Sequence, residues 1–180
     1  MIAKLIAGRN CLGNRRQIFF CGISGYDTHQ NQNSDLADLC QELGNALSAF
    51  NSSVTSLGID DSVLLFTNSD FTRTLTPNGN DPISSGSDHG WGGHQIVMGG
   101  PVIGKNIYGS FPSLKVGQDN DTDRNRGRWI PTTAVDQYAS VCARWLGVES
   151  SALEAIFPNL PRFDDPFTSA TANLQFLTSV

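Results

Sequence analysis

The longest regular pattern of apolar positions lies between residues 36 and 57. Apolar residues recur there at intervals of three and four: Leu36, Leu39, Cys40, Leu43, Leu47, Phe50, Val54 and Leu57. This spacing places them along one face of a helix, and Ser and Gly are residue types that commonly begin and end helices. We therefore expect a long amphipathic helix that begins at Ser34 and ends at Gly58.

Three short apolar runs predict strands around this helix. Residues 17–23 (Q-I-F-F-C-G-I) and 63–66 (V-L-L-F) flank it, and residues 94–99 (H-Q-I-V-M-G) follow a Gly-rich loop. Continuous apolar runs of this length are typical of strands that are buried on both faces, and a helix between two such strands forms a right-handed β-α-β unit. The pattern thus predicts the α/β fold class, with a parallel sheet.

The remaining periodic segments predict shorter helices. One spans the N-terminus up to Gly8, one begins at the capping pattern Thr133-x-x-Asp136 and ends at Gly147, and one begins at Ser151 and ends before Pro158. A chain that opens inside a helical pattern suggests a portion of a larger protein. We find no repeats and expect a single α/β domain over residues 1–180, with residues 158–180 as an extended tail.

Composition excludes two classes of partner. The net charge is −5, and no Lys or Arg cluster follows a periodic face, which argues against a nucleic-acid surface. We expect Arg124, Arg126 and Arg128 to be solvated loop charges. No apolar run approaches the ~18 residues of a membrane span. The four cysteines form no C-x-x-C pair, so we expect buried free thiols, although spacing leaves a disulfide open.

Candidate metal ligands gather in three loops that follow the predicted strands. These loops hold all three histidines of the chain, and the candidates are Asp27, His29, Asp70, Asp88 and His89, with His94 close by. Carboxylate and imidazole groups suit a divalent metal such as Zn²⁺, Mn²⁺ or Fe²⁺. Each aspartate taken alone could instead be a turn or helix-capping residue. Their coincidence in these loops favours a metal site.

Two further patterns concern charge. Arg73 follows Asp70 by three residues and could hold a phosphate or sulfate oxygen as an anion clamp, or form a salt bridge to Asp70. Asp119, Asp121 and Asp123 alternate as in a calcium loop, but Arg124 stands in place of the required glycine and Ile130 in place of the closing glutamate. We interpret this segment as a flexible acidic loop.

Four motifs carry a resemblance to a known family. They are S-G-Y-D-T-H-Q at residues 24–30, T-N-S-D-F-T-R-T at 67–74, G-S-D-H-G-W-G at 86–92 and I-Y-G-S-F-P-S-L at 107–114. In this order they resemble the C-terminal half of a large bacterial family of uncharacterised proteins, a domain of unknown function regarded as sulfatase-like. The resemblance implies the parallel-sheet fold of the alkaline phosphatase superfamily, C-terminal portion only. It also implies export to the periplasm by the twin-arginine route, with any signal upstream of Met1.

The resemblance also implies roles for individual residues. In the mutase branch of that superfamily, one metal is bound by an Asp and a His from one loop and by a later His, and Asp27, His29 and His89 look like these ligands. The second metal takes an Asp-His pair, where this chain has Asp70 followed by Phe71. The superfamily's nucleophile lies in the N-terminal half, so the resemblance implies that this chain contains none.

Our leading hypothesis is therefore the C-terminal part of a metal-dependent hydrolase that acts on small phosphate or sulfate esters, with little turnover by itself. The competing hypothesis is a binding or structural protein that keeps the fold without the chemistry. A third is an interaction module whose exposed edges cause self-association.

Overall fold

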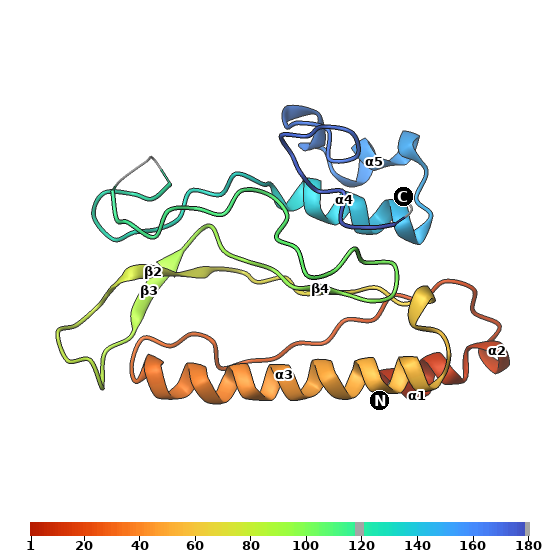
Figure 1. Ribbon diagram of the computed structural model, residues 1–180, viewed down its shortest axis with the longest axis horizontal. Helices are drawn as coiled ribbons and strands as arrows, with labels where there is room; N and C mark the ends of the chain where they lie inside the picture. Colours follow the sequence, from red (N-terminus) through yellow and green to blue (C-terminus); the bar gives the residue numbers. More distant parts are fainter. Residues whose placement is uncertain (118–120, 179–180) are drawn as a thin grey trace.

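The computed structural model describes residues 1–117 and 121–178, and helices form its two outer layers (Figure 1). The helix α3 runs along one long side, α4 and α5 lie on the opposite side with the C-terminal segment, and the strands lie between them. The elements are α1 (Ile2–Ala7), α2 (Arg9–Leu12), α3 (Gln32–Ser56), β1 (Leu65–Phe66), β2 (Thr72–Pro77), β3 (Ser87–Gly90), β4 (Val97–Met98), α4 (Val135–Leu146) and α5 (Ser150–Ile156), with short 3-10 helices at Asp60–Ser62 and Leu160–Arg162.

The predicted long helix is confirmed as α3. It begins two residues before the predicted start, because Asn31, with a φ of 50°, forms the N-cap in place of Ser34. The Ser34 hydroxyl donates to the Asn31 carbonyl at 2.9 Å inside the first turn. Among the described residues of this helix only Val54 is buried, so most of its apolar face is partly open to solvent.

The strand pairing differs from the expectation. The mixed α/β class is confirmed, but the strands of the described part of the chain form two small antiparallel sheets, β1 with β4 and β2 with β3. The segment at residues 17–23 forms no strand, and its Ile18 and Phe20 side chains are 80% and 93% exposed. No strand in the described part of the chain pairs with it, so the predicted parallel β-α-β unit does not form.

The best-packed core lies between α4 and the C-terminal segment. Val141 and Cys142 from α4 are buried against Leu174 and Phe176, and Phe176 is only 2% exposed. The same burial raises the pKa of the Cys142 thiol to about 12. The predicted tail is therefore a structural part of the core.

Two local expectations need correction. Cys11, Cys21 and Cys40 are exposed free thiols, because the segments that carry them are not packed between layers. The predicted capping box of α4 is replaced by the Gln137 side chain, whose oxygen accepts the Ala134 N–H at 2.9 Å. The predicted end at Gly147, in the left-handed conformation, is confirmed. No helix of residues 1–117 and 121–178 is long and apolar enough to cross a membrane.

Candidate metal site

The antiparallel hairpin of β2 and β3 supplies one side of the candidate site. Its register places Arg73 directly opposite His89, and Thr72 opposite Gly90. Cross-strand partners project from the same face of an antiparallel pair, so Arg73 and His89 share a face. Arg73, three residues after Asp70, thus lies on strand β2.

The loop that carries Asp27 and His29 is attached to the segment entering β3. The Asn31 N–H donates to the Ser84 carbonyl at 3.0 Å, and the Ser87 N–H donates to the Thr28 carbonyl at 3.4 Å. Gly86 permits this approach, because a Cβ atom at that position would lie only 2.2 Å from the Thr28 carbonyl oxygen. The close contact brings two loops together that are about sixty residues apart in the sequence.

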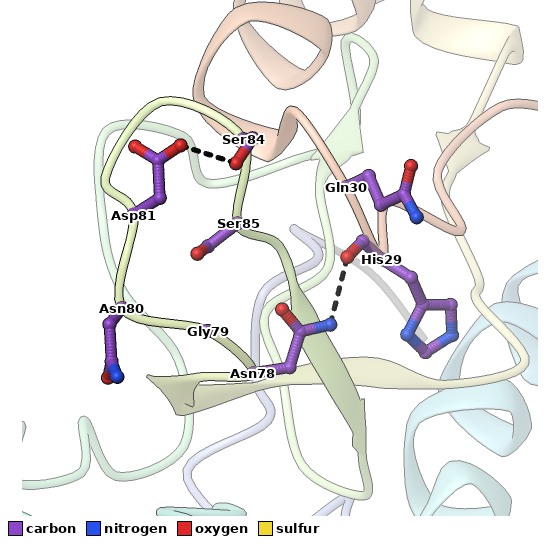
Figure 2. Close-up of a pocket in the computed structure, with 8 residues that line it drawn as sticks. All are labelled: His29, Gln30, Asn78, Gly79, Asn80, Asp81, Ser84 and Ser85. Carbon is purple, nitrogen blue, oxygen red and sulfur yellow. Dashed lines mark hydrogen bonds between the residues drawn. The ribbon is translucent and has the colours of Figure 1, made fainter.

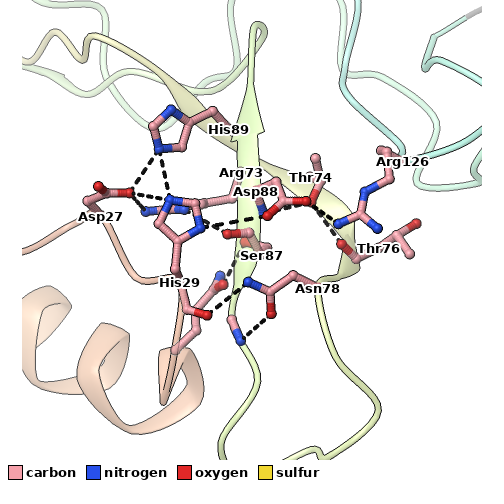
Figure 3. Close-up of polar contacts among 12 residues, drawn as sticks. Asp27, His29, Arg73, Thr74, Thr76, Asn78, Ser87, Asp88, His89 and Arg126 are labelled. Atoms are coloured by element: carbon pink, nitrogen blue, oxygen red, sulfur yellow. Dashed lines mark hydrogen bonds and ion pairs between the residues drawn. The ribbon is translucent and has the colours of Figure 1, made fainter.

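Asp27, His29 and His89 direct their ligand atoms at one another (Figure 3). The Asp27 Oδ1 atom lies 3.0 Å from His29 Nε2 and 2.9 Å from His89 Nε2, and the two Nε2 atoms are 3.1 Å apart. All three side chains are about half exposed. The cluster thus lies at the surface with one side open to solvent.

Arg73 supports the carboxylate of this cluster. Its guanidinium is mostly buried and donates to Asp27 Oδ1 at 2.6 Å, to the Tyr26 carbonyl at 2.9 Å and to the Ser87 carbonyl at 2.8 Å. Hydrogen bonds from His89 and Arg73 lower the pKa of Asp27, so the side chain stays ionised. Arg73 does form a salt bridge, but its partner is Asp27 and not Asp70, the partner that the sequence had suggested.

Asp88 lies behind His29, on the far side of its ring from the cluster. Its Oδ1 atom is 3.6 Å from His29 Nδ1, and its other oxygen pairs with the Arg126 guanidinium. Carboxylates commonly face the second nitrogen of a metal-binding histidine and fix the ring orientation. Asp88 therefore occupies the position of an orienting group, and Arg126 is not the free loop charge that the sequence suggested.

Asp70 and His94 lie outside the cluster. Asp70 is exposed and is absent from the group of convergent ligand atoms in the described part of the chain. The His94 ring packs against Phe111 and Trp129, with centroid distances of 5.0 and 5.1 Å. The structure thus gathers three of the predicted ligands and separates two of the other candidates.

In the described residues of the acidic loop, the aspartates accept hydrogen bonds that stabilise the loop. Asp121 accepts the Ser113 N–H at 2.6 Å, and Asp123 accepts the Arg126 N–H at 2.7 Å and pairs with Arg128 at 3.1 Å. These bonds lower the pKa of Asp123. Asp119 lies outside the described residues, so the expectation for it stays a prediction.

A polar pocket of about 560 Å³ adjoins the cluster (Figure 2). At the edge of the pocket, Asn78 Nδ2 donates to the His29 carbonyl at a distance of 2.9 Å. The His29 ring points away from the loop of residues 78–85 that forms most of the lining. The pocket is lined by His29, Gln30, Asn78, Gly79, Asn80, Asp81, Ser84 and Ser85. Amide and hydroxyl groups dominate the lining, and no lysine or arginine belongs to it.

The three ligand atoms fit a divalent metal ion. Tetrahedral Zn²⁺ with bonds of about 2.0–2.1 Å sets its ligand atoms roughly 3.3 Å apart. The observed separations of 2.9 to 3.1 Å would need to widen by only a few tenths of an ångström. An ion bound by these three side chains on an exposed face would keep a coordination position open.

Sequence reasoning missed two of the residues around this cluster. Arg126 gave no signal, because its partner Asp88 lies 38 residues away and the pairing depends on the loop's course. Phe71 stands out in the sequence only as the residue after Asp70, yet its ring is stacked on that of His89. The two-residue spacing between Phe71 and Arg73 was the available signal.

Comparison with known proteins identifies a family but no activity. Neither the curated proteins nor the solved structures contain a match to this chain. Residues 2–128, which include the whole Asp27, His29 and His89 cluster, match the family described as "Protein of unknown function (DUF1501)". The chain belongs to this family.

Proposed function

We propose that Asp27, His29 and His89 bind one divalent metal ion, and that the chain is the metal-binding part of a phosphate- or sulfate-ester hydrolase. The observation that carries the proposal is the convergence of one carboxylate oxygen and two Nε2 atoms within about 3 Å of one another. Zn²⁺ and Mn²⁺ both accept this set of ligands.

The surrounding residues suit such a role. Arg73 holds the Asp27 carboxylate, and the Asp88 carboxylate faces the rear nitrogen of His29 at 3.6 Å, so each of these two ligands has a charged neighbour beside it before a metal binds. A metal in an open site acts as a Lewis acid on an ester oxygen. Export to the periplasm is part of the same proposal.

We place the nucleophile outside this chain, as the resemblance implies, and expect little or no ester hydrolysis from the chain alone. The role of Arg73 as an anion clamp is less favoured by its contacts. Its two terminal nitrogens already donate to protein oxygens, so substrate would have to displace one of these bonds.

The alternative function is that of a binding or structural protein without metal. It is favoured by a specific observation: the Asp27 carboxylate is already hydrogen-bonded by His89 and Arg73, so the cluster is satisfied as a polar network. Metal binding must therefore be measured directly.

Calorimetric titration of the metal-free chain with Zn²⁺ and with Mn²⁺ tests the proposal. We expect near one equivalent for one of these ions, and a loss of at least about tenfold in affinity for His29→Ala, because an open three-ligand site loses one of its ligands. Asp70→Asn serves as the control, since Asp70 lies outside the cluster. No uptake of either metal, or equal affinity in His29→Ala, would favour the structural alternative.

A further inference from the structure

Phe71 forms the closest ring contact of the candidate site. Its ring lies parallel to that of His89, with a centroid distance of 3.9 Å and an interplanar angle of 6°. Among the described residues, the contacts of His94 with Phe111 and Trp129 are looser. Their centroid distances are 5.0 and 5.1 Å, and the rings are tilted or edge-on to each other. The His89 imidazole is thus held face to face by an aromatic neighbour.

The hairpin register explains why this contact forms. Arg73 lies directly opposite His89, and Phe71 lies two residues earlier, directly before the first residue of β2, with its ring against that of His89. A residue two positions from the direct partner is a diagonal neighbour, which an aromatic side chain can reach. The Arg73 guanidinium also contacts the Phe71 ring, with its Cζ atom 5.2 Å from the ring centroid.

The three ligands therefore have three different supports. Arg73 holds Asp27 and Asp88 faces His29, whereas the His89 ring makes no hydrogen bond within the described residues except to Asp27 and His29 themselves. An exposed imidazole with only those partners could rotate away when they move to bind a metal. The stacked ring supplies the missing restraint.

We infer that Phe71 is a positioning residue that fixes the plane of the His89 imidazole, so that Nε2 faces the other two ligands. The inference rests on the proposed metal site. Restricting a ligand to its binding orientation raises affinity, because the ordering cost is met before binding.

The test compares Zn²⁺ affinity in three variants with that of the wild-type chain. Phe71→Leu keeps an apolar side chain but removes the stacked ring, and we expect a loss of about tenfold, which is typical when an outer support of a metal ligand is removed. Phe71→Tyr keeps the aromatic ring and should therefore bind Zn²⁺ with nearly the affinity of the wild-type chain. Phe111→Leu is the matched control, because Phe111 packs against His94, a histidine outside the cluster.

A second readout works without metal. In the proton NMR spectrum of the metal-free chain, the ring protons of His89 should be shifted upfield by the stacked Phe71 and should return toward ordinary positions in Phe71→Leu. Unchanged His89 signals, or a Phe71→Leu variant that binds Zn²⁺ as tightly as the wild-type chain, would overturn the positioning role and leave the metal site standing. A wild-type chain that binds no metal would remove both proposals together.

Discussion

Gly86 is the single residue on which the geometry of the cluster depends most. It lies where the segment entering β3 passes the backbone of the loop that carries Asp27 and His29, and a Cβ atom there would be 2.2 Å from the Thr28 carbonyl oxygen and 2.3 Å from the His29 carbonyl carbon. Both clashing atoms belong to backbone, which cannot rotate out of the way. The distance from Asp27 and His29 to His89 therefore depends on the absence of a side chain at Gly86.

We predict that Gly86→Ala lowers the free energy of unfolding by about 1–3 kcal/mol, the usual cost of overpacking, and weakens metal binding as the two loops separate. Urea unfolding and Zn²⁺ titration measure the two effects. Gly44→Ala is the matched control. Gly44 lies within α3 with open space around it, so alanine there should be neutral or stabilising by up to about 1 kcal/mol. A neutral Gly86→Ala would show that the loops approach less closely than described.

At the scale of elements, the helices could be predicted from the sequence and the strand pairing could not. The spacing of Leu36 to Leu57 and the glycines at helix ends record local preferences, which operate wherever the helix lies. Strand pairing depends on neighbours that are distant in sequence. The apolar run at 17–23 has a strand-like composition, yet the described part of the chain offers it no partner.

The hairpin of β2 and β3 is the opposite case, a strand pair that forms where the sequence predicts none. Its residues Thr72–Pro77 have polar side chains and a proline, a pattern without strong alternation, and it was not expected from the sequence. It forms because β3 lies beside it with Arg73 opposite His89. The three predicted ligands could be named by residue type and by resemblance. The supports Arg126 and Phe71 act through pairings that only the fold creates.

At the scale of the whole molecule, the accessible surface is large for the length of the chain. It amounts to 11700 Å², whereas the scaling for compact monomers of this size gives roughly 8,500 Å². Many large apolar side chains are exposed, and among them Phe20 and Ile18, 93% and 80% exposed, lie on the extended segment at residues 17–23. Unpaired extended backbone with exposed apolar side chains favours pairing with another chain.

We therefore expect the isolated chain to self-associate in a concentration-dependent way, as light scattering can measure. Phe20→Lys places a charge at the centre of the extended segment and should shift the population toward monomer, because charged side chains oppose edge pairing. Ile83→Lys is a suitable control, since Ile83 is also exposed but lies in the loop between β2 and β3. A wild-type chain that stays monomeric at all concentrations would contradict this expectation.

The most direct test of the central claim is the metal content of the purified chain, measured by plasma mass spectrometry beside two histidine variants. The proposed site predicts close to one equivalent of a divalent metal in the wild-type chain and in His94→Ala, whose histidine packs on Phe111 and Trp129, and a loss of that metal in His89→Ala. Metal that persists in His89→Ala, or that is absent from all three after incubation with Zn²⁺ and Mn²⁺, would contradict the metal site.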